Sequence, residues 1–371
     1  MRILLTVNAA WNVWNFRRPI VQSMLAEGHS VSILAPSDDA SPALERLGCQ
    51  LLPFEMDAKG LNPLDAVKLV RRFRHHFGQA RPDAILSYTI KNNIFGAMAA
   101  TSMRIPFIPT VTGLGTAFLS GNLLQTVATQ LYRPAFRSLD TVFFQNPDDR
   151  NEFLKHRLVS ETQARLLPGS GIDLAHFLQT QFPDEAKPPI FLMVARLLRD
   201  KGTYEFVEAA RQIKTVRSDA RFQLLGALDS ENRTAIGAPE VEAWVAQGVV
   251  EYLGQVDDVR PHVAAASCVV LPSYREGAPR TLIEAASMAR PVIATDVPGC
   301  RSVVDRDVSG FLCEVRNPDS LAAAMQRFLE LPHAVKIEMG LAGRAKMERE
   351  FDQSIVVSAY RQAIGAAVQA M

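Results

Sequence analysis

The sequence predicts an α/β protein with two parallel-sheet domains. Short apolar runs rich in β-branched residues alternate with amphipathic stretches of helical period, which is the pattern of β-α-β units. A chain of 371 residues is long for a single core and suits two domains. A linker around residues 169–189 separates two such alternating series. We therefore expect two Rossmann-like domains.

The first series begins with a strand over residues 2–7, a helix over 19–27 and a strand over 30–35. Gly28 ends the helix, because glycine adopts the left-handed conformation of a helix C-terminus without strain. A crossover through a helix makes the flanking strands parallel. Further strands are predicted at residues 49–54, 83–88, 107–111 and 141–145. The first domain is expected to span residues 1–168.

The second series supplies the second domain, which we place at residues 169–351. Its chain ends in a tail, residues 352–371, whose apolar side chains recur at helical spacing and predict a helix over 351–367. The strands of this domain are predicted from the apolar runs at 190–195, 220–225, 249–253, 268–271, 291–295 and 310–314.

The composition indicates a soluble protein without special cofactor chemistry. It is 48% hydrophobic and 21% charged, with a net charge of +1. Residues 1–170 are nevertheless mildly basic, with 18 Lys and Arg against 13 Asp and Glu. The four cysteines form no C-x-x-C pair, which disfavours a zinc site and a disulfide framework. Without a signal peptide pattern or a long apolar run, we expect a cytoplasmic location.

Two carboxylates eight positions apart, Glu276 and Glu284, flank a turn that leads from a predicted strand into a helix. Free N–H groups at a helix start attract phosphate, so a nucleotide diphosphate can bind above Pro279, Arg280 and Thr281. The two carboxylates then reach different parts of one ligand, and their oxygens suit sugar hydroxyls. A turn glutamate and a solvated helix glutamate would explain the spacing equally well.

A second motif lies about eighty residues upstream, where Arg196 and Lys201 stand between a predicted strand and an amphipathic helix over 204–213. Two fixed cations beside a departing phosphate stabilise its developing charge and so lower the barrier. Taken singly, a loop arginine or lysine is more often solvated.

Together these motifs resemble the signature of family 4 retaining glycosyltransferases, which have the two-domain GT-B fold. The resemblance implies that Arg196 and Lys201 clamp the donor diphosphate, and that Glu284 binds the nucleotide ribose. It implies that the domains face a cleft and that the tail helix crosses back to the first domain. Catalytic roles fall to Arg196, Lys201 and Glu276, and donor-binding roles to Gly277, Ala278, Pro279, Arg280, Thr281 and Glu284.

The acceptor is expected in the first domain, where the motifs are less specific. Lys91 and Asn92 follow one predicted strand, and Gly113 and Gly115 follow the next. These segments resemble those of family members that extend glycans on a polyprenyl diphosphate, such as capsule, O-antigen and bacterial N-glycan transferases. The resemblance makes Lys91 a partner of the acceptor diphosphate and lets the glycine backbone approach it. A solvated loop lysine is the alternative.

The loop after the first strand, residues 8–15, lacks the glycines that many relatives carry there. Asn8 is predicted to hydrogen-bond a sugar or phosphate, and Trp11 or Trp14 to stack on a sugar ring. Burial of the tryptophans between the domains is an equal alternative. Arg17 is a candidate cation for the acceptor, with an ordinary solvated arginine as its alternative.

The segment 68–77 places basic residues on one helix face and apolar residues on the other. Such a face can dock on anionic lipid headgroups, which would fit a lipid-linked acceptor and binding to the cytoplasmic face of the inner membrane. An ordinary basic surface helix is the alternative. Nucleic acid is disfavoured because the chain is nearly neutral.

These predictions converge on a retaining hexosyl- or N-acetylhexosaminyltransferase that uses a UDP-sugar donor and a lipid-linked glycan acceptor. Neither a cofactor nor a metal is expected, since Asp305 and Asp307 read as turn residues and the histidines show no ligand spacing. Two alternatives stay open: a nucleotide-sugar epimerase or hydrolase on the same fold, and a GT-B scaffold without catalysis.

Overall fold

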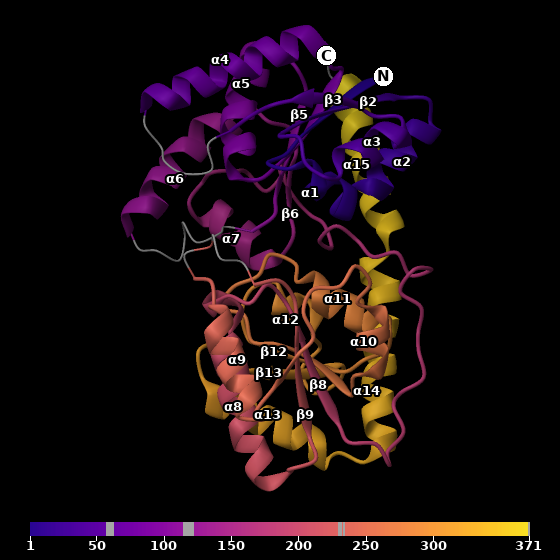
Figure 1. Ribbon diagram of the computed structural model, residues 1–371. Helices are drawn as coiled ribbons and strands as arrows, with labels where there is room; N and C mark the ends of the chain where they lie inside the picture. Colours follow the sequence, from indigo (N-terminus) through magenta and orange to yellow (C-terminus); the bar gives the residue numbers. More distant parts are fainter. Residues whose placement is uncertain (57–62, 114–121, 229–231, 233, 370–371) are drawn as a thin grey trace. The chain divides into compact units, whose positions relative to one another are not determined.

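The computed structural model describes the chain except residues 57–62, 114–121, 229–231, 233 and 370–371 (Figure 1). The chain divides into two compact units. Unit 1 comprises Met1–Gly171 and Gln353–Met371, and unit 2 comprises Ile172–Asp352. Each unit has its own parallel sheet covered by helices, as the alternating apolar pattern predicts.

Unit 1 has a seven-stranded sheet with the order β3-β2-β1-β4-β5-β6-β7. The strand order reverses at β1, where β2 and β4 pair with its two edges. In open parallel sheets, ligands bind beyond the carboxyl ends of the strands near such a reversal. The strands are β1 (Arg2–Thr6), β2 (Ser30–Ala35), β3 (Gln50–Pro53), β4 (Ala84–Tyr88), β5 (Phe107–Val111), β6 (Val142–Phe144) and β7 (Ala164–Leu166).

Helices cover both faces of this sheet (Figure 1). A π-helical segment, η1 (Asn92–Gly96), follows β4 and continues directly into α5. The helices of unit 1 are α1 (Ala10–Phe16), α2 (Arg18–Ala26), α3 (Ser41–Leu47), α4 (Pro63–Ala80), α5 (Ala97–Ser102), α6 (Asn122–Phe136), α7 (Pro147–Lys155) and α15 (Gln353–Gln369).

The tail helix α15 packs on unit 1 beside α2, in agreement with the expected return of the chain to the first domain (Figure 1). Its Tyr360 is 1% exposed, and its hydroxyl shares a hydrogen bond with Thr110 Oγ1 at the end of β5. The Tyr360 ring also packs against Phe143, with ring centroids 5.0 Å apart. This buried aromatic anchor explains why the tail belongs to unit 1.

Unit 2 has a six-stranded parallel sheet with the order β10-β9-β8-β11-β12-β13. Its central strands are buried on both faces, as expected of a sheet covered by helices on two sides. The strands are β8 (Ile190–Val194), β9 (Arg221–Leu225), β10 (Glu251–Tyr252), β11 (Cys268–Leu271), β12 (Val292–Thr295) and β13 (Gly310–Cys313). The helical segments are η3 (Arg199–Lys201), α8 (Thr203–Val216), α9 (Ala238–Ala246), α10 (Arg260–Ala265), α11 (Arg280–Ser287), α12 (Cys300–Val303), α13 (Pro318–Glu330), α14 (His333–Lys346) and η4 (Met347–Phe351).

The predicted loop over residues 8–15 is wrong. After Val7, the chain turns at Ala9 and enters α1, which buries Ala10 and Val13 against the first sheet. Asparagine has a low helix propensity, so Asn12 and Asn15 concealed this helix in the sequence. Packing of the two buried side chains outweighs that propensity.

Candidate functional site

The loop that carries Lys201 is pressed against the end of a neighbouring strand. Lys201 closes the short 3₁₀ turn η3, and Gly202 follows with φ +77° as the residue before α8. A Cβ atom at Gly202 would lie 2.0 Å from the carbonyl oxygen of Pro272, just beyond β11. Only glycine fits this contact, which brings the η3 loop against the loop that carries Glu276.

Within unit 2, the two loops join their predicted site residues directly. Lys201 Nζ donates a hydrogen bond to Glu276 Oε1 at 2.6 Å, and the two side chains are 27% and 13% exposed. The backbone N–H of Tyr274 also donates to Asp200 O at 2.9 Å. The cation of one motif and the carboxylate of the other therefore form one partly buried ion pair.

Gly299, which precedes α12, packs closely against the backbone of the Glu276 loop. Gly299 has φ +81°, and a Cβ atom there would lie 2.6 Å from the carbonyl oxygens of both Glu276 and Gly277. Ala278 is partly exposed and Pro279 is buried. The close contact with Gly299 thus restricts the backbone conformation of the turn between Glu276 and Glu284.

Helix α11 begins at Arg280, and Pro279 is the residue before the helix. Its first intrahelical hydrogen bond runs from Leu282 N to Pro279 O at 3.1 Å. The amides of Arg280 and Thr281 therefore come before that bond, where helix starts bind anions. Thr281 Oγ1 donates to Val194 O at 2.9 Å and ties the helix start to the end of β8.

Glu284 is paired inside its own helix. Arg280 Nε donates to Glu284 Oε1 at 2.7 Å, across one helical turn, and the Glu284 side chain is 14% exposed. Burial raises the pKa of the Glu284 carboxyl above its ordinary value, and the Arg280 charge opposes that rise. The carboxylate is thus oriented and poorly solvated, as suits a group that accepts hydrogen bonds from hydroxyls.

Arg196 lies just beyond β8 and is exposed. Its carbonyl oxygen accepts a hydrogen bond from Leu198 N at 2.8 Å within the turn. Gly226, with φ +149°, stands beside this turn, because a Cβ atom there would lie 1.9 Å from Ala195 O. Arg196 and Lys201 thus flank one short loop, from which Lys201 contacts Glu276.

One polar pair beside the site was not predicted. Tyr274 Oη donates to Glu205 Oε1 at 2.7 Å, which links the Glu276 loop to the first turn of α8. The Arg316 guanidinium lies over the Tyr274 ring, 4.6 Å from its centroid. Burial, with Glu205 beside it, raises the pKa of Tyr274. No sequence signal reveals this pair, since the two residues belong to different β-α units.

In unit 1, the predicted acceptor-binding residues Asn8 and Arg17 differ in solvent exposure. Asn8 is exposed, and its Oδ1 accepts from Asn12 Nδ2 at 3.4 Å. Arg17 is only 4% exposed, and its guanidinium lies 4.3 Å from the centroid of the Tyr88 ring. Its Nη1 donates to Phe16 O at 3.0 Å. Arg17 is therefore a buried cation in the sheet-end packing, and we no longer assign it a direct contact with the acceptor.

Asn92 needs the same correction, because it is fully buried and hydrogen-bonded within the protein. Its Nδ2 donates to Thr6 Oγ1 at 2.6 Å, and its Oδ1 accepts from Thr89 Oγ1 at 2.9 Å. Thr89 has φ +73°, a strained conformation for a β-branched residue. This asparagine fastens η1 to the end of β1, so its effect on a ligand is indirect.

The remaining acceptor candidates lie near the same sheet edge. Lys91 precedes η1 and is partly exposed, while Gly113 follows β5 with φ +129°. The positive φ at Gly113 is the conformational freedom that the prediction required. Gly115 lies outside the described residues.

The Asp305 and Asp307 carboxylates are engaged in ion pairs. Lys346 Nζ donates to Asp305 Oδ1 at 2.6 Å, and Arg327 Nη2 donates to Asp307 Oδ1 at 3.1 Å. Asp307 has φ +62° in the turn before β13. Across the described ranges, no group of three or more His, Cys, Asp and Glu side chains is arranged to hold a metal ion.

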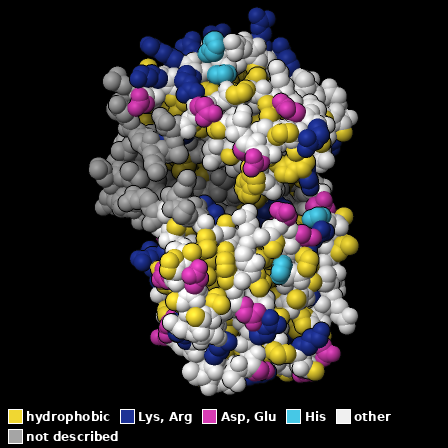
Figure 2. Space-filling view, in the orientation of Figure 1, with side chains coloured by type: hydrophobic (Ala, Val, Ile, Leu, Met, Phe, Trp, Pro, Cys, Tyr) yellow, Lys and Arg dark blue, Asp and Glu magenta, His cyan; other side chains and the backbone are white. Residues whose placement is uncertain are grey.

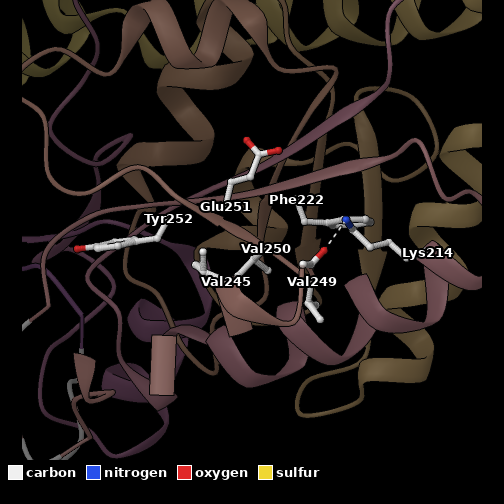
Figure 3. A pocket seen from close by; sticks show the side chains of 8 residues that line it. Lys214, Phe222, Val245, Val249, Val250, Glu251 and Tyr252 are labelled. Carbon is white, nitrogen blue, oxygen red and sulfur yellow. Dashed lines mark hydrogen bonds between the residues drawn. The ribbon is translucent and has the colours of Figure 1, made fainter. Parts of the chain in front are cut away.

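A pocket of about 420 Å³ lies at the β10 edge of the second sheet (Figure 3). The predicted site residues do not line it. Lys214 Nζ is used in a hydrogen bond to Gly248 O at 2.8 Å, and Glu251 is paired with Arg221. The two charged groups of this pocket thus already have protein partners.

Two family models match most of the chain. Residues 13–169 match the model described as a glycosyl transferase 4-like domain, and residues 188–331 match the model described as glycosyl transferases group 1. With two parallel-sheet α/β units and the paired motifs of unit 2, the molecule is a glycosyltransferase of the GT-B fold class. The chain belongs to the glycosyltransferase family that these two models describe.

Its relatives include enzymes of bacterial glycan assembly. The N,N'-diacetylbacillosaminyl-diphospho-undecaprenol alpha-1,3-N-acetylgalactosaminyltransferase of Campylobacter jejuni is 27% identical over 377 residues, which cover 97% of each chain. The UDP-Gal:alpha-D-GlcNAc-diphosphoundecaprenol alpha-1,3-galactosyltransferase of Escherichia coli is 24% identical over 75% of this chain and 72% of its own. Anabaena Alr3699/HepE in complex with UDP-glucose has the same fold, with a TM-score of 0.76, 18% identity and full coverage of both chains.

Proposed function

We propose that this glycosyltransferase moves a hexosyl or N-acetylhexosaminyl group from a UDP-sugar to a sugar carried on a polyprenyl diphosphate. The observation that carries the proposal is the contact of Lys201 with Glu276 beside the start of α11, because it joins a cation suited to phosphate with a carboxylate suited to sugar hydroxyls. The names of the Campylobacter and Escherichia relatives supply the acceptor class, and the second of them supplies the UDP donor.

On the donor side, the diphosphate binds Lys201, Arg196 and the amides at the start of α11. Glu276 accepts hydrogen bonds from the sugar hydroxyls, with the backbone of Gly277 to Pro279 beside it. Glu284, oriented by Arg280, accepts from the ribose hydroxyls; this assignment is supported by the 2.7 Å pairing and the low exposure of the carboxylate.

The reaction proceeds with retention of the anomeric configuration. The bond between the anomeric carbon and the departing phosphate oxygen breaks, and a new bond forms on the same face to the acceptor hydroxyl oxygen. The hydroxyl proton passes to the departing phosphate, so that UDP leaves and no protein base is needed. Arg196 and Lys201 stabilise the charge on that phosphate, which is the role that a metal ion would otherwise fill.

On the acceptor side, the lipid-linked sugar binds at the carboxyl edge of the first sheet. Lys91 pairs with the acceptor diphosphate, the backbone at Gly113 approaches it, and Asn8 contributes a hydrogen bond. Asn8 follows β1 and Lys91 follows its neighbour β4, so both lie at the strand-order reversal, which supports the assignment.

The lipid carrier places the acceptor at a membrane, and α4 offers a surface for that encounter. Lys68, Arg71, Arg74 and His75 are exposed on this helix, while Phe73 and Phe77 are buried beneath it. Figure 2 shows the basic and histidine side chains gathered over the α4 end of unit 1. Among the described residues, no helix combines the length and apolar character needed to cross a bilayer. We propose that α4 binds the anionic cytoplasmic face of the inner membrane.

The direct test incubates the purified chain with a panel of UDP- and GDP-sugars and polyprenyl-diphosphate-linked N-acetylhexosamines. We expect a disaccharide product from a UDP-sugar, whose proton NMR coupling reports the same anomeric configuration as the donor, with equal yield after chelation of metals. An inverted product would contradict the mechanism. Donor consumption without a glycosidic product would favour a hydrolase or epimerase, and no UDP binding at all would favour a scaffold.

A further inference from the structure

Trp11 is an exposed aromatic side chain at the carboxyl edge of the first sheet. It stands in the first turn of α1, directly beyond β1, and is 53% exposed. In the parts of the chain that the structure describes, every other Phe, Tyr or Trp side chain is buried or only partly exposed. An exposed indole ring offers a large apolar face on which a ligand ring can stack.

The Trp11 ring is held in place although it is exposed. The Trp11 backbone N–H donates to Asp38 Oδ2 at 2.7 Å, which fixes the helix start to the loop after β2. The Trp11 and Phe16 rings pack edge to face, with centroids 5.4 Å apart and an interplanar angle of 85°. A ring that is fixed before binding loses little conformational entropy when a ligand stacks on it.

Three amide side chains belong to the same short segment as Trp11. Asn15, one helical turn further on, donates to Trp11 O at 3.0 Å, and Asn8 is exposed at the end of β1. Asn12 carries a buried Oδ1 for which the described residues provide no hydrogen-bond partner. An exposed apolar ring on a segment that also carries amide donors and acceptors suits a pyranose, which has a C–H face and a rim of hydroxyls.

The other two tryptophans are already covered. The Arg18 guanidinium lies over the Trp14 ring, 4.9 Å from its centroid, and Trp244 is 7% exposed in the core of unit 2. The sequence alone left Trp11 and Trp14 as equal candidates for stacking. The structure presents Trp11 instead of Trp14.

We propose that Trp11 is a stacking platform for a pyranose ring of the acceptor glycan, and that the amides of Asn8 and Asn15 bind hydroxyls at the rim of that ring. The platform makes the enzyme recognise the sugar of the acceptor in addition to its diphosphate. This inference rests on the proposed function, because it requires that the acceptor is a glycan.

Kinetic variants test the platform. Trp11→Ala should raise the acceptor KM about fivefold to tenfold, which corresponds to the usual strength of one aromatic contact, while UDP affinity stays unchanged. Trp11→Phe should fall between the two proteins, since it keeps a smaller ring. Trp14→Phe is the matched control and should leave the acceptor KM unchanged. An acceptor KM for Trp11→Ala equal to that of the wild type would overturn the proposal.

A binding measurement separates this proposal from the catalytic one. In the double variant Trp14→Phe/Trp244→Phe, Trp11 is the sole tryptophan, because the chain has three. A short-chain polyprenyl diphosphate bearing one N-acetylhexosamine should protect its fluorescence from acrylamide quenching, whereas the sugar-free polyprenyl diphosphate should not. Protection without any transfer by the wild type would support the platform and refute the transferase proposal. Equal quenching with both probes would refute the platform even if transfer occurs.

Discussion

Lys201 and Glu276 lie 75 positions apart in the sequence, yet Lys201 Nζ and Glu276 Oε1 are 2.6 Å apart. Gly202 and Gly299 make this approach feasible, since each permits a backbone contact that a Cβ atom would block. In the proposed donor complex, Lys201 turns to the diphosphate and Glu276 to the sugar. Donor binding must therefore replace one ion pair by two ligand contacts.

That exchange predicts opposite effects of one substitution on two ligands. Glu276→Gln releases Lys201 from its partner, so UDP alone should bind about three- to tenfold more tightly, as expected for the loss of a partly buried competing carboxylate. Sugar transfer should fall by at least about a hundredfold, because the sugar loses its charged acceptor. Titration calorimetry and turnover measure the two effects. Glu208→Gln, an exposed glutamate on α8, serves as the control and should change neither. Weaker UDP binding by Glu276→Gln would contradict the exchange.

The buried Glu284 carboxyl predicts a pH dependence of donor binding. Because its pKa is raised in the folded protein, it takes up a proton at a higher pH than an exposed glutamate does, whose ordinary value is 4.5. Only the ionised group offers all its lone pairs to the ribose, so UDP affinity should fall at a higher pH than an exposed glutamate would give. Glu284→Gln should bind UDP more weakly at pH 7.5 and lose this pH dependence. If UDP affinity falls at low pH in the same way in both proteins, a group other than Glu284 titrates.

Gly299 predicts a steric effect on the donor loop. In Gly299→Ala, the new methyl group meets two carbonyl oxygens of the Glu276 loop, so the loop must move and the donor KM should rise about tenfold. Gly248→Ala is the matched control, since Gly248 also has a positive φ, +68°, but has open space around a Cβ atom. Gly248→Ala should lose about 1 kcal/mol of stability from its strained backbone, and Gly299→Ala should lose more because its methyl group also displaces the loop. An unchanged donor KM in Gly299→Ala would show that the loop tolerates the shift.

The basic face of α4 predicts selective membrane binding. The double variant Arg71→Glu/Arg74→Glu should bind phosphatidylglycerol vesicles at least about tenfold more weakly than the wild type, because each basic residue near an anionic surface contributes about 1 kcal/mol. Neither protein should bind phosphatidylcholine vesicles. Reversal of two exposed arginines of unit 2, Arg327→Glu/Arg349→Glu, controls for net charge and should have little effect in sedimentation. Equal loss in both double variants would assign the binding to overall charge.

Much of the fold follows from local sequence pattern. Runs such as Ile190–Val194 and Cys268–Leu271 are apolar and β-branched because parallel strands are buried on both faces, and this pattern predicts them directly. Helix α1 and strand β7 show why some elements escaped prediction. Helix α1 is masked by its asparagines, and the three-residue strand β7 is an edge strand with two exposed side chains and no apolar run.

The site was less predictable than the fold. The residue types around Glu276 and Glu284 indicate phosphate and sugar chemistry, but the spacing within a chain does not reveal contacts between loops of different β-α units. The link of Tyr274 to Glu205 and the burial of Asn92 arise from tertiary packing. The sequence made Trp11 and Trp14 equal candidates for stacking on a sugar, and the greater exposure of Trp11 in the structure favours Trp11.

The central claim is that Lys201 is the cation that binds the donor diphosphate, and UDP titration of Lys201→Met tests it most directly. Methionine keeps the length of the side chain and removes its charge. We predict that calorimetry shows UDP binding to the wild type and a loss of affinity of about 10- to 100-fold in the variant, as expected for one charge-assisted hydrogen bond. Wild-type affinity for UDP in a folded Lys201→Met protein would contradict the account.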